Sequence, residues 1–250
     1  MGASDQTGSK VDGGSQVRPL WVGNRKELPI FAAQIASKHG GKMPPGAFGI
    51  LDGYAKRYLS DGDDFVYFDH AYFKRGWQES NFRAIRNGLH LTQLLDRPKD
   101  RLDKWGVKIE PWRKTGSEIV IIPPSDAQKA IYGCDDWLMG IESKLAEITD
   151  RPVTCKNSKN SSLRDFLFDA WAVVTFASVA GVEAALMGIP VFSTKNCPSW
   201  PVCAGTLEQL ETPEYSDARA ELAASLTYAT WNWDEMERVR WEDYHYEINA

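Results

Sequence analysis

The stretch that decides the fold is Ala172-Val173-Val174-Thr175-Phe176-Ala177-Ser178-Val179-Ala180-Gly181-Val182-Glu183-Ala184-Ala185-Leu186-Met187-Gly188-Ile189-Pro190-Val191-Phe192. Its first five residues are almost all apolar and predict a buried strand. The residues from Ser178 onward predict a helix that ends at Gly188, and the run after Pro190 predicts another buried strand. A strand, a helix and a strand in this order are typical of a parallel sheet with crossover helices.

The same alternation extends toward the amino terminus of this stretch. Apolar runs predict strands at 119–122 and 152–155, and apolar residues at helical spacing predict helices at 136–148 and 163–168. Pro123 and Pro124 end the first of these strands, and Ser125 followed by Asp126 is a cap for a helix through Ile131. Residues 116–205 are therefore expected to form one α/β unit.

A second α/β unit is expected at 19–115, where strands at 18–23, 47–51 and 65–68 alternate with helices at 27–39 and after Asp52. Residues 71–114 are less regular, basic and rich in aromatic residues. The segment 206–250 is expected to add helices at 215–229 and 231–241 that pack back on the first half, and residues 1–18 to be a mobile tail. The predicted fold is α/β, with two Rossmann-like halves, the first of them compact, and C-terminal helices.

Composition excludes several classes of protein. The chain has 250 residues, 43% of them hydrophobic, and a formal net charge of −5, which excludes wholesale disorder, collagen and coiled coil. No apolar run approaches the ~18–20 residues that cross a bilayer, so no membrane partner is expected. Four cysteines are too few for a disulfide scaffold, and we expect a cytoplasmic location.

The start of the helix after strand 172–176 has the chemistry of an anion site. Free N–H groups at Ser178, Val179 and Ala180, together with the helix dipole, would bind a phosphate. Glu183, one turn further on, would accept hydrogen bonds from a ribose diol. The alternative is an ordinary buried crossover helix with no ligand.

The segment 175–191 resembles the donor-site signature of GT-B-type glycosyltransferases: a strand, a Ser/Thr-rich turn, a Gly-containing helix start, a Glu and then small-Leu-x-Gly-x-Pro. Further blocks, at 68–73, 81–87 and 226–236, resemble those of bacteriophage-encoded relatives thought to glycosylate hydroxymethylated pyrimidines in DNA. The resemblance implies a metal-independent transferase without a resident cofactor, a nucleotide-sugar donor such as a UDP-sugar, and double-stranded DNA as acceptor. It also implies a location in the cytoplasm of an infected bacterial host.

The resemblance also implies roles for particular residues. The donor would be held by Ser125, Lys156, Lys159, Thr175, Ser178, Val179, Ala180 and Glu183. The catalytic residues would be Asp69, preferred as general base, and His70 beside it. The acceptor or phosphates would be bound by Tyr72, Arg75, Arg83, Arg86 and Asn87. The structural alternatives are that Asp69 and His70 cap the next element and that the two lysines are solvated loop charges.

Two metal hypotheses are disfavoured by their context. Asp61-Gly62-Asp63-Asp64 precedes a strand, whereas a metal-binding Asp-x-Asp follows one, and Cys197 and Cys203 lack a second ligand pair. Two other functions stay open: a nucleotide-sugar epimerase or hydrolase on the same scaffold, and a non-catalytic module that binds nucleic acid through the basic region at 72–114.

Overall fold

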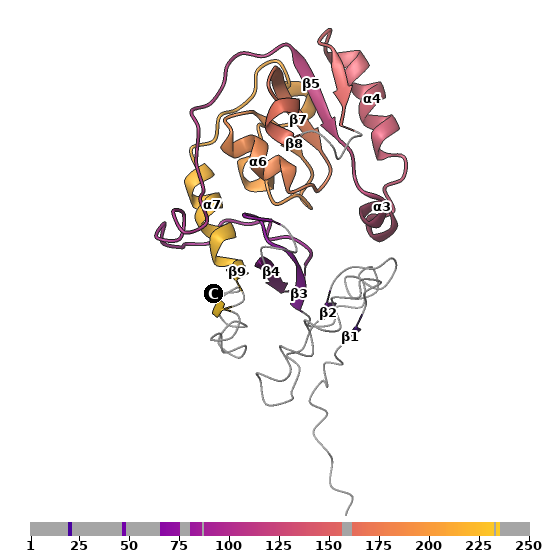
Figure 1. Cartoon of the computed structure of the whole chain (residues 1–250). Coiled ribbons are helices and arrows are strands. Elements are labelled where there is room, and N and C mark those ends of the chain that lie inside the picture. The colour runs from indigo at the N-terminus through magenta and orange to yellow at the C-terminus, as the bar shows by residue number, and fades with distance from the viewer. Residues whose placement is uncertain are drawn as a thin grey trace, which may run out of the picture.

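The structure, a computed structural model, describes residues 20–21, 47–48, 66–75, 81–86, 88–156, 162–232 and 234–235. The strands in these ranges form a four-stranded and a five-stranded sheet. Helix α7 (Arg219–Tyr228) extends from the unit around the four-stranded sheet toward the five-stranded sheet (Figure 1). The expected tail 1–18, the helix 27–39 and the turn 61–64 lie outside the described residues.

The four-stranded sheet consists of β5 (Glu118–Ile122), β6 (Val153–Cys155), β7 (Ala170–Thr175) and β8 (Val191–Ser193). Its order is β6-β5-β7-β8, and every neighbouring pair is parallel. The predicted parallel sheet with crossover helices in the second half is therefore confirmed. Its helices are α3 (Asp126–Tyr132), α4 (Trp137–Ile148), α5 (Leu163–Phe166) and α6 (Ala180–Leu186).

Both faces of this sheet are covered, which explains why its strands are apolar throughout. Ile119 and Ile121 of β5 lie fully buried in one cluster with Leu145 of α4. Val120 and Ile122 belong to the cluster on the opposite face, together with apolar residues of α6 and α7. Two single turns, η1 (Trp200–Val202) and η2 (Leu207–Gln209), follow β8. The second half is thus a three-layer α/β/α arrangement.

The boundaries of α3 follow from its caps. The Ser125 side chain accepts from the backbone N–H of Gln128, and the Gln128 side chain accepts from the N–H of Ser125, which together form a capping box. Gly133, in the left-handed conformation, ends the helix. The predicted cap at Ser125 is confirmed.

The five-stranded sheet has the order β1-β2-β3-β4-β9. The strands β1 (Leu20–Trp21), β2 (Ala47–Phe48) and β3 (Val66–His70) are parallel, as the alternation of strands and helices predicted. The strands β4 (Asn81–Arg86) and β9 (Thr230–Asn232) add to it in antiparallel pairs. The first sheet is therefore mixed.

Neither β4 nor β9 was predicted. Strand β4 carries Asn81 and Arg83 at buried positions, so its sequence reads as polar although it lies inside the protein. The predicted helix 231–241 is wrong at its start, because Trp231 pairs with Phe82 as part of β9. A three-residue strand has little propensity signal of its own and forms because a partner strand lies beside it.

Helix α7 (Arg219–Tyr228) connects the two sheets in sequence and in space (Figure 1). Leu222 and Leu226 of this helix are fully buried. The guanidinium of Arg219 donates to the carbonyls of Glu110 and Ala185 at 2.8 and 2.9 Å, which ties the start of α7 to the end of α6.

The turn after α6 requires a glycine. Gly188 has a φ of +79°, and a Cβ there would lie 2.0 Å from the carbonyl oxygen of Pro111. We therefore expect Gly188→Ala to lower the free energy of unfolding by at least ~2 kcal/mol, measured by urea denaturation. Gly133→Ala is the matched control, because Gly133 has a φ of +61° but no atom within 4 Å of the added Cβ. It should cost only about 1 kcal/mol, and equal losses in the two variants would contradict the close approach to Pro111.

Candidate functional site

The candidate site lies at the carboxyl ends of β5 and β7. The chain leaves β5 toward β6 on one side and leaves β7 toward β8 on the other, so the loops after the two central strands diverge. Ligands of open parallel sheets bind at such switch points. Thr175 is one of the residues predicted to bind the nucleotide-sugar donor. It is buried, and its hydroxyl donates a hydrogen bond to the carbonyl of Ile122 at 2.9 Å. Thr175 therefore joins the two strand ends.

The loop between β7 and α6 differs from the predicted helix start. Helix α6 begins at Ala180 rather than Ser178, and the Ser178 hydroxyl accepts from the N–H of Ala180 at 3.2 Å. The N–H of Ala180 is thus already used. Within the described part of the chain, the N–H groups of Ser178 and Val179 have no acceptor. The side chain of Val179 is buried in the core, so only its backbone is a candidate for ligand contact.

The carbonyl of Ala177 is a junction between three elements. It accepts from the side-chain amide of Gln128 at 2.9 Å, and the imidazole of His90 lies close enough for this carbonyl to affect its pKa. Ser125, which was predicted to bind the nucleotide-sugar donor, is exposed and contacts Gln128 through the capping box. The contact of Ser125 with this loop is therefore indirect, through Gln128.

Lys156 follows β6 at the same edge of the sheet. Its backbone N–H donates to the carbonyl of Ile121 at 2.9 Å, and its Nζ lies 5.0 Å from the ring centroid of Phe166 in α5. Lys159, the second predicted lysine, lies outside the described residues.

Buried Arg83 forms an ion pair with half-buried Asp69 between β3 and β4. The Arg83 guanidinium donates to the Asp69 carboxylate at 2.7 Å, to the carbonyl of His70 at 2.9 Å and to the carbonyl of Leu89 at 3.1 Å. Tyr67 donates to the same carboxylate at 2.8 Å, and the N–H of His70 donates at 2.7 Å. Every nitrogen of Arg83 and both oxygens of Asp69 are thus engaged within the protein.

These contacts determine the charge of Asp69. Burial opposes ionisation, but the Arg83 guanidinium and the hydrogen bonds from His70 and Tyr67 outweigh it, so the pKa of Asp69 lies below its usual value. A carboxylate with a low pKa and three donors is a weak proton acceptor. The geometry favours a positioning role for Asp69, the residue that the sequence favoured as general base.

The other predicted acceptor residues have different surroundings. The hydroxyl of Tyr72 accepts from the N–H of Leu91 at 2.8 Å, and burial raises the pKa of Tyr72 to about 12. Tyr72 is therefore a core residue. Arg86 is the last residue of β4, and Asn87 lies outside the described residues.

His90 lies in this region without having been predicted as a site residue. Its ring centroid is 6.2 Å from that of Tyr72, and its buried Nδ1 has no hydrogen-bond partner among the described residues. Burial and the nearby Arg83 guanidinium hold the pKa of His90 well below its usual value, although Asp69 opposes this. The sequence contains no local signal for this placement, because Ala177 and His90 come from different halves of the chain.

Arg75 and Glu183 form an ion pair between the two halves, 108 positions apart in sequence. Arg75 lies just after β3, and Glu183 is in the first turn of α6. The two side chains are 40% and 32% exposed, so the pair lies at the surface rather than in the core. A residue predicted to bind the acceptor is thereby in contact with a residue predicted to bind the donor.

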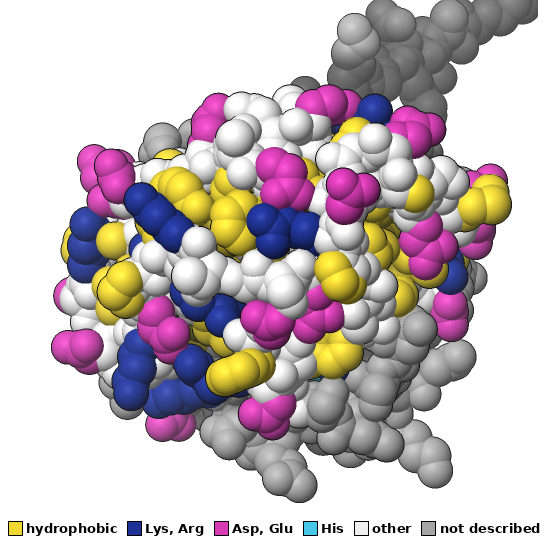
Figure 2. Space-filling model, turned by 90° about the horizontal axis from the view of Figure 1, so that it is seen from above, with side chains coloured by type: hydrophobic (Ala, Val, Ile, Leu, Met, Phe, Trp, Pro, Cys, Tyr) yellow, Lys and Arg dark blue, Asp and Glu magenta, His cyan; other side chains and the backbone are white. Residues whose placement is uncertain are grey.

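Much of the described basic charge in 97–114 is paired within the protein. Arg101 and Lys104 both contact Glu235, and Arg101 also lies 5.2 Å from the ring centroid of Tyr228. Arg113 donates to the carbonyls of Leu167 and Phe168. On the face shown in Figure 2, Lys and Arg side chains gather toward one side but are interspersed with Asp and Glu. Among the side chains coloured there, no extended surface carries a single sign of charge.

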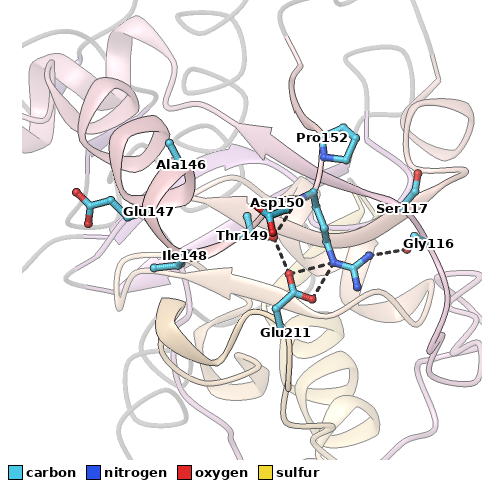
Figure 3. A pocket seen from close by; sticks show the side chains of 10 residues that line it. Gly116, Ser117, Ala146, Glu147, Ile148, Thr149, Asp150, Pro152 and Glu211 are labelled. Carbon is cyan, nitrogen blue, oxygen red and sulfur yellow. Dashed lines mark hydrogen bonds and ion pairs between the residues drawn. The ribbon is translucent and has the colours of Figure 1, made fainter.

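A separate hollow of about 700 Å³ lies at the opposite edge of the sheet, where β5 and β6 begin (Figure 3). Arg151 lines it and donates to both oxygens of Glu211 and to the carbonyl of Gly116. The guanidinium also lies over the ring of Trp171, with its Cζ 4.1 Å from the ring centroid. This hollow is distinct from the carboxyl edge, where the predicted site residues lie.

No protein-family model and no curated protein matches the chain. Among the described residues, no helix is long and apolar enough to cross a membrane, and no group of three or more potential ligands is suited to a metal ion.

The environment of His90 makes the stability of the protein depend on pH. An unfolded histidine takes up a proton near pH 6.5, whereas folded His90 does so only at lower pH. The free energy of unfolding should therefore fall as the pH is lowered from 7.5 to 5.5, by up to ~1.4 kcal/mol per pH unit below pH 6.5. Urea denaturation of the wild type and of His90→Gln measures this. A slope that His90→Gln leaves unchanged would show that His90 is not the responsible group.

Proposed function

We propose that the protein is a glycosyltransferase that moves a sugar from a UDP-sugar or a related nucleotide donor to a hydroxyl group. The observation that carries the proposal is the Arg75–Glu183 ion pair at the carboxyl edge of the parallel sheet. It joins the donor-type block at 175–191 to the segment after the Asp69-His70 block. A transferase of this class needs such a meeting of the halves, because donor and acceptor must react between them.

The donor side of the proposed site is the loop between β7 and α6. The N–H groups of Ser178 and Val179, which have no acceptor among the described residues, would donate to a diphosphate. Glu183 would accept from the ribose hydroxyls. Lys156 and Lys159 would neutralise the leaving diphosphate, and Ser125 would lie at the edge of the nucleotide. Ala180 and Thr175 support the loop through the contacts described above.

The acceptor side is the end of β3, at Asp69 and His70. In the transfer step, the acceptor oxygen forms a bond to the anomeric carbon while the bond from that carbon to the diphosphate breaks. The acceptor proton must pass to a base. We assign the His70 imidazole as this base, because Asp69 already accepts three hydrogen bonds. Asp69 is then a charged neighbour that positions His70.

The acceptor is proposed to be a hydroxymethylated pyrimidine in phage DNA. This choice follows from the resemblance of the blocks at 68–73 and 81–87.

Release of UDP from UDP-glucose and other UDP-sugars tests the proposal. Release should require hydroxymethylpyrimidine DNA and should not occur with unmodified DNA of the same sequence. Release of UDP without DNA would instead favour a nucleotide-sugar hydrolase. DNA binding without any release would favour a non-catalytic binding module.

The roles of Asp69 and His70 predict different effects of substitution. His70→Ala should lower kcat about 10²–10⁴-fold, with the KM for the donor and the melting temperature little changed. Asp69→Asn should instead destabilise the fold by ~3 kcal/mol, because it leaves the buried Arg83 guanidinium without its counter-charge. Steady-state kinetics and thermal unfolding of both variants measure this. Full activity in His70→Ala would contradict its assignment as base.

A further inference from the structure

In the Arg75–Glu183 ion pair, each side chain is partly exposed and is held mainly by the other. Within the described part of the chain, the Arg75 guanidinium has no other hydrogen-bond acceptor, and the Glu183 carboxylate has no other donor. Both side chains are partly exposed, at 40% and 32%. Ion pairs at such exposure contribute little to stability, so a ligand that contacts both groups would displace the pair at small cost.

The charges around Arg75 favour an additional anion. Arg83 repels Arg75, while Asp69, which attracts it, is already paired with Arg83. Among the described residues, Glu183 is the only anion that forms an ion pair with Arg75. If a ligand took over Glu183, the guanidinium would lie beside Arg83 without a counter-charge of its own.

One chemical class of ligand satisfies both groups at once. A carboxylate accepts hydrogen bonds from the two hydroxyls of a ribose, and a guanidinium binds two phosphate oxygens side by side. In a nucleoside diphosphate the ribose and the first phosphate are neighbours. A ligand whose ribose reaches Glu183 therefore brings a phosphate close to the side chain that Glu183 releases.

We infer that Arg75 is a donor-binding residue that changes partners, contacting Glu183 in the empty protein and the diphosphate when a nucleoside diphosphate is bound. This inference rests on the proposed function and deepens it. Arg75 comes from the first half of the chain and the donor loop from the second. Donor binding then replaces a contact within the protein by one through the ligand, and the two halves stay joined while the donor is present.

Calorimetric titration with UDP and with uridine tests the exchange, because the two ligands differ only in the phosphates. Arg75→Gln should bind UDP about tenfold more weakly than the wild type, since the phosphate loses a charged donor. The same variant should bind uridine as tightly as the wild type or up to about threefold more tightly, because Glu183 no longer has a competing partner. Arg75→Lys should retain most of the UDP affinity.

Arg164→Gln is the matched control, because Arg164 also forms an exposed ion pair with a glutamate, Glu110, which lies beside the end of α6 at the other edge of the sheet. It should leave both affinities unchanged. Tighter binding of both ligands by Arg75→Gln would mean that Arg75 only blocks Glu183. Weaker binding of both would mean that Arg75 supports the fold. Either result overturns the inference, and so does an unchanged UDP affinity. Wild-type protein that binds no UDP would overturn the proposed function itself.

Discussion

The buried guanidinium of Arg83 is the constraint on which the site depends. A cation inside a protein must be neutralised and fully hydrogen-bonded, and Arg83 meets this requirement through Asp69 and the carbonyls of His70 and Leu89. These contacts join β3, β4 and the segment that carries His90. They hold the end of β3 and the imidazole of His90 in one place, next to the carbonyl of Ala177.

The two halves meet where the central strands of the parallel sheet end. On one side, Thr175 joins β7 to β5, and Gln128 joins α3 to the loop after β7. On the other side, His90 and Arg75 reach across to Ala177 and Glu183. These polar contacts accompany an apolar cluster that also spans the two halves, in which Tyr72 and Ile85 are buried together with Val182. A few polar groups beside an apolar lining are typical of ligand sites.

Part of the candidate site was predictable because its signals are local. Ser125 and Gln128 are three residues apart and form a capping box, and Glu183 is one turn into a helix that begins after a buried strand. Other residues had the expected chemistry but different partners. Arg83 and Tyr72 were candidates for ligand contact because of their functional groups, yet both are buried and hydrogen-bond within the protein. Whether a polar side chain faces a ligand or the core depends on neighbours that are distant in sequence.

The sequence by itself determined the parallel sheet of the second half, since runs such as 119–122 are too apolar to face water and the segments between them have helical spacing. It also determined the parallel order of β1, β2 and β3. Only the tertiary structure decided that 81–86 and 230–232 are strands, because a polar strand becomes stable only when a partner such as Asp69 balances its buried Arg83. Tertiary structure alone likewise paired Arg75 with Glu183, since contacts between residues 108 positions apart depend on how the two halves pack.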